Sequence, residues 1–158
     1  MRLFHFSDDP GIKRFVPRPV RVPSKRAKGM EWLNGPLVWA IDAWHEPMYL
    51  FLRECPRILL WRLPQTSNAD IAKWFDEIRA RVLAHIEEAW LERLESETIY
   101  RYELPVDSFE NLKDAGQWVS RETVIPLRIE ALTDLRAELV ARDVDLRVLP
   151  RLTPLKHV

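Results

Sequence analysis

A histidine near the start of the chain stands in a pattern that is typical of a cleft lining. Residues 3–7 alternate, and the period of two in a strand puts Leu3, His5 and Ser7 on one face. An imidazole and a hydroxyl on one face of an otherwise apolar strand indicate a surface that meets a ligand. The alternative is a histidine that is hydrogen-bonded at a sheet edge.

A second histidine belongs to a cluster that follows a strand-like run. If residues 45–53 form a helix, His45 and Tyr49 stand four residues apart on one face. An imidazole and a phenol that converge on a strand end can hold a nucleobase or a sugar by stacking and hydrogen bonding, with Trp39 nearby. The alternative puts Trp39 and Tyr49 in the core and makes Asp42 the cap of that helix.

A third polar group, Ser120-Arg121-Glu122, interrupts a run that is otherwise typical of a strand. A carboxylate and a guanidinium at a strand break can stand at the mouth of a site. Glu122 would there bind a ribose hydroxyl or act as a base. The alternative is a bulge or hairpin turn with exposed charges.

The most basic part of the chain is the segment of residues 13–28, which contains three prolines and no acid. The prolines block a helix and favour extended or irregular backbone. Arginine presents a fork of donors to phosphate oxygens, so this basic segment can hold a phosphate-bearing ligand or a nucleic acid. Arg18 and Arg21 stand beside the prolines. The alternative is a solvated loop. Its seven cations are Lys13, Arg14, Arg18, Arg21, Lys25, Arg26 and Lys28.

Composition excludes several classes of protein. The chain has 158 residues, and its 24 Lys and Arg balance 24 Asp and Glu. The balance is uneven, because residues 1–66 carry 11 basic and 6 acidic side chains and residues 67–158 carry 13 and 18. Only 4 glycines are present and no glycine-rich phosphate motif occurs. A lone Cys55 excludes a disulfide framework or a thiolate zinc cluster.

Metal, membrane and export functions are not expected either. Neither His85 nor His157 has the spacing of a metal-ligand pair, so we predict no metal site. No apolar run reaches the length of about 20 residues that a membrane span needs, and the N-terminus lacks a signal core. We therefore expect a cytoplasmic protein without membrane partners.

The elements that would position these groups are short. Strand-like runs bounded by turn or proline signals cover residues 3–6, 36–41, 57–63, 98–104, 117–120, 123–125 and 144–149. One helical pattern starts at Ser67 and can be followed to Leu94, with a suspected break at 81–86 where a strand or turn would lie. Thr133-Asp134 caps a second helix. We predict one α+β domain over residues 1–158, with mainly antiparallel strands and two or three helices.

The whole chain resembles a bacterial family of small uncharacterised proteins, to which no activity is assigned. The matching stretches run nearly end to end: LFHFSDDPGIKRFVPRP, PLVWAIDAWHEPMYLFLRECPRILLW, IYRYELP, GQWVSRETVIPL and DLRVLPRLTPL.

A more distant resemblance is to the ADP-ribosyltransferase-like fold, which includes RNA 2′-phosphotransferases and several toxins. Those proteins open with a strand of the form L-Y-H-G-T or L-Y-H-x-S, and residues 3–7 here read L-F-H-F-S. Their second strand, V-[WYF]-A-T-D, is matched by V-W-A-I-D at residues 38–42. A late strand supplies a third residue, often glutamate, and Glu122 is the best match.

That resemblance implies an NAD or ADP-ribose site and transfer of an ADP-ribosyl or phosphoryl group. It implies that His5 binds a ribose of NAD, that Tyr49 or Trp39 stacks on nicotinamide, and that Glu122 orients the other ribose. His5 and Glu122 are then the candidate catalytic residues. The candidate cofactor-binding residues are Ser7, Arg18, Trp39, His45, Tyr49, Ser120 and Arg121. The alternative function is a non-enzymatic module that binds RNA or a protein through the basic segment.

Overall fold

The computed structural model describes residues 1–156, so the expectation for His157 lies outside the described residues. The chain forms two compact units, and each is built from two stretches of sequence. Unit 1 comprises Met1–Glu46 and Ile99–Ala131, and unit 2 comprises Pro47–Thr98 and the chain from Leu132 onward. Over the described residues the fold is α+β with mostly antiparallel strands, which confirms the predicted class, but it has four short helices where two or three were predicted. The single domain stays a prediction.

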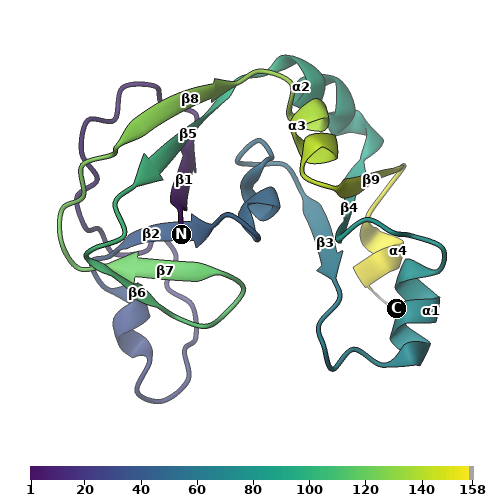
Figure 1. Cartoon of the computed structure of the whole chain (residues 1–158), viewed down its shortest axis with the longest axis horizontal. Coiled ribbons are helices and arrows are strands. Elements are labelled where there is room, and N and C mark those ends of the chain that lie inside the picture. The colour runs from purple at the N-terminus through teal and green to yellow at the C-terminus, as the bar shows by residue number, and fades with distance from the viewer. Residues whose placement is uncertain (157–158) are drawn as a thin grey trace. The chain divides into compact units, whose positions relative to one another are not determined.

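Unit 1 is organised by a six-stranded sheet (Figure 1). In sheet order its strands are β6 (Phe109–Asn111), β7 (Gln117–Ser120), β2 (Val38–Asp42), β1 (Leu3–Ser7), β5 (Ile99–Leu104) and β8 (Arg128–Leu132). The central strand β1 is antiparallel to both neighbours, with Leu3 opposite Asp42 on one side and opposite Leu104 on the other. Strand β7 is antiparallel to β2, with Ser120 opposite Val38.

The two faces of this sheet differ. One face carries the buried cluster around Leu3, Val38 and Tyr102, and Phe15 of the basic segment packs onto it. Phe15 is held there by two backbone hydrogen bonds with Val124, of 2.8 and 2.9 Å. The other face carries Phe4 and charged residues of β5, because neighbouring residues in a strand point to opposite sides.

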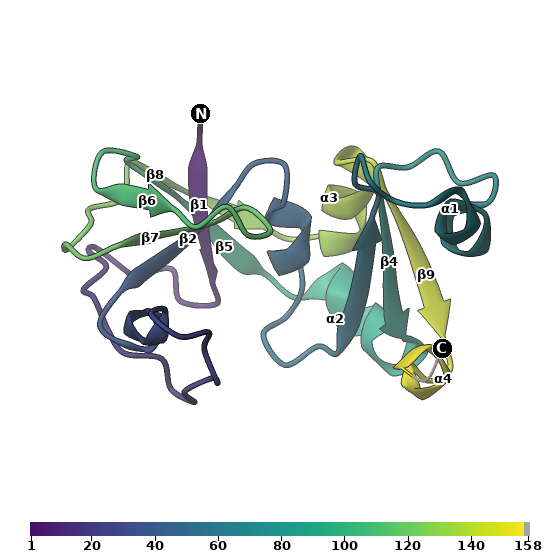
Figure 2. The same ribbon diagram turned by 90° about the horizontal axis from the view of Figure 1, so that it is seen from below.

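Unit 2 contains a three-stranded sheet, which Figure 2 shows from a second direction. Strand β4 lies between β3, to which it is antiparallel, and β9, to which it is parallel. The strands are β3 (Arg57–Trp61), β4 (Val82–Glu87) and β9 (Val144–Leu149), and the helices are α1 (Asn68–Phe75), α2 (Leu91–Ser96), α3 (Leu135–Ala141) and α4 (Thr153–Lys156). Three 3-10 turns complete the described elements: η1 (Glu31–Asn34), η2 (Glu46–Tyr49) and η3 (Glu88–Trp90).

The long helical pattern after Ser67 is broken as suspected, since β4 lies inside it between α1 and α2. The helix predicted over residues 45–53 is wrong, because only the single turn η2 forms there. Leu50, Phe51 and Leu52 are all buried, and three consecutive buried side chains do not suit one face of a helix. No helix within residues 1–156 has the length and apolar character needed to cross a membrane.

Candidate functional site

Most candidate site residues lie near one of the two ends of strand β2. We call these the Val38 end and the Asp42 end. The antiparallel partner β1 starts opposite Asp42 and therefore finishes, at Ser7, toward the Val38 end. Strand β7 also finishes at the Val38 end, where Ser120 lies opposite Val38.

Three candidate residues come to the Val38 end from distant parts of the sequence. Ser7 is the last residue of β1, and Glu122 lies two residues after Ser120, the last residue of β7. Arg18 pairs with Leu37, the residue before β2, through two backbone hydrogen bonds of 3.2 and 3.1 Å. A hydroxyl, a guanidinium and a carboxylate are therefore carried by three fixed backbone segments around one strand end.

His5 lies in the middle of β1 and is held in one tautomer. Its Nδ1 lies 2.9 Å from the backbone oxygen of Trp39, and a carbonyl oxygen only accepts hydrogen bonds. In the neutral imidazole Nδ1 therefore carries the proton and Nε2 carries the lone pair. The Phe15 ring lies against the imidazole, with ring centroids 4.7 Å apart. The sequence interpretation did not single out Phe15 because its partner is ten residues away and on another segment.

The Ser120-Arg121-Glu122 group forms a turn whose serine is internal. Ser120 is completely buried, and its hydroxyl lies 2.7 Å from the hydroxyl of Ser108. The same oxygen accepts a hydrogen bond of 3.2 Å from the Glu122 backbone nitrogen. Arg121 lies over the Trp32 ring, 4.5 Å from its centroid. Ser120 thus fixes the backbone of Glu122, whose side chain is exposed.

Trp39 lies on the other face of the sheet from Val38 and Ala40, following the strand alternation. It packs beside the buried residues Leu33, Leu37 and Val119. Its indole Nε1 is buried and has no hydrogen-bond partner among the described residues. This position agrees with the alternative in which Trp39 contributes to a core.

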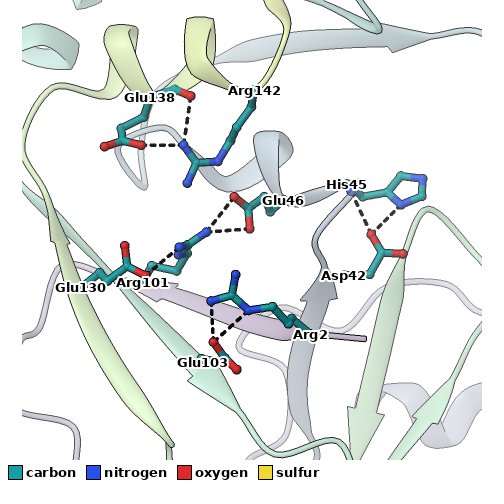
Figure 3. A network of polar contacts seen from close by, with 9 residues as sticks. All are labelled: Arg2, Asp42, His45, Glu46, Arg101, Glu103, Glu130, Glu138 and Arg142. Carbon is teal, nitrogen blue, oxygen red and sulfur yellow. Dashed lines mark hydrogen bonds and ion pairs between the residues drawn. The ribbon is translucent and has the colours of Figure 1, made fainter.

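The Asp42 end holds a tightly built aspartate–histidine pair (Figure 3). Asp42 Oδ1 accepts hydrogen bonds of 2.8 Å from both the backbone nitrogen and Nδ1 of His45. Asp42 thus closes the turn of residues 43–45 that precedes η2, whereas the longer helix that it was weighed as capping does not form. Gly116, with φ +73°, closes over the pair: an added Cβ would lie 2.8 Å from Asp42 Oδ1 and closer still to His45 Nδ1. Glycine is required for this approach.

The candidate residues are thus not gathered in one place. Glu122 follows Val38's partner Ser120, whereas His45 follows Asp42, so they lie beyond opposite ends of β2. Tyr49 belongs to unit 2, and the other candidates belong to unit 1. The structure brings Ser7, Arg18 and Glu122 to one strand end, with His5 in the adjacent strand.

An ionic network, also drawn in Figure 3, occupies the charged face of β5 and was not anticipated. Arg101 pairs with buried Glu46 at 2.9 Å and with exposed Glu130 at 2.7 Å. Its Nε is buried without a hydrogen-bond partner among the described residues. Nearby, Arg2 Nη2 lies 2.6 Å from Glu103 Oε1, and this hydrogen bond lowers the pKa of Glu103. Such pairs join residues up to 101 positions apart, so no sequence spacing reveals them.

Within residues 1–156, no three His, Cys, Asp or Glu side chains gather in a way that could hold a metal ion. The side chains at and near the Val38 end can take part in hydrogen bonding, charge pairing and proton transfer. Glu122, Arg18 and His5 supply these functions at or near the Val38 end.

Comparison with known proteins identifies a family but no activity. The chain belongs to a family of unknown function, DUF6886, whose model matches residues 4–158. No curated protein and no solved structure matches it.

Proposed function

We propose that unit 1 binds a nucleotide of the NAD or ADP-ribose type at the Val38 end of β2. His5, Arg18 and Glu122 are the residues that would contact the ligand. The single observation that supports the proposal is that the backbone segments of Ser7, Arg18 and the Glu122 turn all end at or pair with this strand end, beside a histidine of fixed tautomer.

The proposed roles follow from the chemistry of each group. Arg18 would hold a phosphate, because a guanidinium donates two parallel hydrogen bonds to phosphate oxygens. The backbone N–H of Arg18 donates to Leu37 O and the backbone oxygen of Arg18 accepts from Leu37 N, and these two bonds fix where the side chain of Arg18 starts. His5 Nε2 would accept a hydrogen bond from a ribose hydroxyl, and Glu122 would accept from a second hydroxyl.

The enzymatic form of this proposal is transfer of the ADP-ribosyl group from NAD. The bond between nicotinamide and C1′ of its ribose breaks, and nicotinamide leaves with the bonding electrons. An acceptor oxygen or nitrogen forms a new bond to C1′. Glu122 takes the proton that this acceptor loses, which is the role of a general base.

Calorimetric titration with NAD and with ADP-ribose tests binding. We expect heat with the wild-type chain and none with Arg18→Glu or His5→Ala, after circular dichroism has shown that each variant folds. Lys28→Glu is the matched control, because Lys28 lies in the same basic segment and is also exposed. Absence of heat with either ligand at millimolar concentration overturns the proposal. In the enzymatic form, Glu122→Gln still binds NAD and releases no nicotinamide.

A second candidate function is binding of RNA, and it is favoured by the lack of ion pairs among the cations of the basic segment. None of its seven cations forms an ion pair with an acid in residues 1–156; Arg26 instead donates to the side chain of Asn34. The segment is nevertheless fixed. The side chain of Asn34 accepts from Ser24 N at 3.2 Å and donates to Ser24 O at 2.8 Å.

Arg21→Glu separates the two candidates, because Arg21 lies outside the proposed nucleotide contacts. In the RNA version this change weakens RNA binding, the binding falls steeply as salt rises, and His5→Ala has no effect. In the nucleotide version Arg21→Glu leaves the calorimetric titration unchanged. Capture of an acidic protein in place of RNA would overturn the RNA version.

A further inference from the structure

Strand β8 forms one border of the six-stranded sheet, as Figure 1 shows at the outer rim of unit 1. It neighbours β5 on one side, and no other strand of residues 1–156 extends this sheet beyond it. A border strand presents a row of backbone donors and acceptors that another strand can pair with. The backbone direction and the side chains of β8 indicate which strand can pair with it.

The direction of the backbone groups in β8 is set by one hydrogen bond. Leu127 N donates to Glu103 O of β5 at 2.8 Å, so the backbone groups of Leu127 face inward. The direction alternates along a strand, and the N–H and C=O groups of Arg128 and Glu130 therefore face outward. The outward groups available for pairing lie symmetrically on either side of Ile129.

The side chains of β8 divide into an apolar row and a charged row. Ile129 of β8 is 44% exposed, and Leu127, the residue before the strand, is 58% exposed. Arg128 and Glu130 alternate with these residues; Arg128 reaches Glu103 at 3.6 Å and Glu130 reaches Arg101 at 2.7 Å, and the two side chains are 62% and 44% exposed. The border strand thus offers apolar groups on one face and one charge of each sign on the other.

We propose that β8 pairs antiparallel with β8 of a second copy of this chain, about a two-fold axis at Ile129. In this register Arg128 lies opposite Glu130 of the second copy, and Glu130 lies opposite its Arg128. Both pairs exchange backbone hydrogen bonds and place opposite charges face to face, which stabilises a cross-strand pair. Leu127 lies opposite the second copy's Ala131, and the two Ile129 side chains meet, so the exposed apolar row is covered.

The charges select this register against its neighbours. An axis at Arg128 would put two arginines directly opposite each other, and an axis at Glu130 would put two glutamates opposite each other. Like charges directly opposite destabilise strand pairing. Charged residues commonly protect border strands against pairing, but here the alternation of sign makes the strand complementary to itself. The residues involved are separate from the proposed nucleotide contacts, so this inference stands independently of that function.

A cysteine placed on the axis tests the register. Directly opposite residues in a non-hydrogen-bonded pair have Cα atoms about 4.5 Å apart, within the range of about 4.4–6.8 Å that a disulfide spans. We expect Ile129→Cys to form a disulfide-linked dimer on mild oxidation. Leu127→Cys is the matched control, because the two Leu127 residues would lie about 13 Å apart along the strands. The native Cys55 is buried and provides the background in the unmodified chain.

Charge exchange gives an independent test in solution. Light scattering should show dimers of the wild-type chain at high concentration and monomers of Arg128→Glu and of Glu130→Arg. A mixture of these two variants restores opposite charges at both pairs and should form a mixed dimer. A wild-type chain that stays monomeric at millimolar concentration overturns the proposal. So does equal crosslinking of Ile129→Cys and Leu127→Cys, or dimerisation that neither charge reversal weakens.

Discussion

The Cα of Gly116 lies so close to the imidazole of His45 that no side chain can be attached there without displacing the Asp42–His45 pair. Two neighbouring residues, Lys113 and Ala115, also have positive φ angles of 55° and 49°. The loop between β6 and β7 thus accepts left-handed backbone at several positions in order to close over this pair. The cost of such backbone, about 1–3 kcal/mol for each residue, must be offset by what the loop holds.

Gly116→Ala should therefore destabilise the fold more than a glycine substitution at a position where the left-handed backbone is strained but no neighbouring atom is close. Gly29→Ala is the matched control, because Gly29 also has a positive φ, of 86°, but nothing lies within 4 Å of an added Cβ. We expect a loss of about 1 kcal/mol for Gly29→Ala from the left-handed backbone. For Gly116→Ala we expect about 3 kcal/mol, since overpacking adds to that strain. Urea unfolding measures both, and equal losses would contradict the close approach.

The buried pair of Arg101 and Glu46 should matter far more for stability than the exposed pair of Arg101 and Glu130. The Glu46 side chain is 4% exposed and the Glu130 side chain is 44% exposed. Glu46→Gln leaves a buried guanidinium with less compensation and should cost about 3–5 kcal/mol. Glu130→Gln should cost less than about 1 kcal/mol. Thermal or urea unfolding of the two variants decides, and a similar loss in both would refute this ranking.

His85 should make stability depend on pH near neutrality. Burial lowers the pKa of His85, although its hydrogen bond with the backbone oxygen of Ile58 opposes the shift. The unfolded chain, with a histidine pKa of about 6.5, then binds a proton that the folded chain does not. The stabilisation is complete above that value and is lost as the pH falls toward the lower folded pKa. The free energy of unfolding, measured by urea titration at several values between about pH 7.5 and about pH 5.5, should change less with pH for His85→Gln than for the wild type.

Glu103 should make the stability of the fold depend on pH in a more acidic range. The hydrogen bond from Arg2 holds the pKa of Glu103 below its ordinary value, so the folded state releases this proton more readily than the unfolded state. The resulting stabilisation is present above the unfolded value of about 4.3 and disappears as the pH falls through the folded pKa. Arg2→Gln should remove this acid dependence. Arg136→Gln is the control, because both arginine side chains are 49% exposed and Arg136 lies 3.6 Å from its partner Glu95. An unchanged acid limb in Arg2→Gln would count against this account.

Local signals predicted some elements well. Helix α3 begins where its cap predicts, since Asp134 accepts a hydrogen bond from Ala137 N, and Leu135 and Leu139 are fully buried at a spacing of four. Strand β4 was harder to distinguish from helix. Its first five residues are all buried, and a strand buried on both faces reads as a continuous apolar run without alternation.

Strand β8 was missed and the strand expected at residues 123–125 is wrong, because Val124 makes only an isolated bridge to Phe15. Four of the five residues of β8 are exposed, so burial gives the sequence little pattern there. The site depended even more on distant pairing. That Ser120 lies opposite Val38, and Asp42 opposite Leu3, follows from strand register, which no local spacing encodes. Hence the types of the candidate residues were visible from sequence, but not which of them share a strand end.

The parallel pairing of β4 with β9 has a consequence for the order in which the chain acquires its structure during synthesis. Val82 of β4 pairs with Val144 of β9, so the last strand of unit 2 emerges from the ribosome only after unit 1 has been completely translated. Unit 1 is itself interrupted by the first stretch of unit 2. The first part of unit 2 must therefore wait, unpaired along one side of β4, while unit 1 closes around β1. A chain that stalls before residue 144 would expose that buried strand, and it is there that chaperones or proteases would find a hydrophobic target.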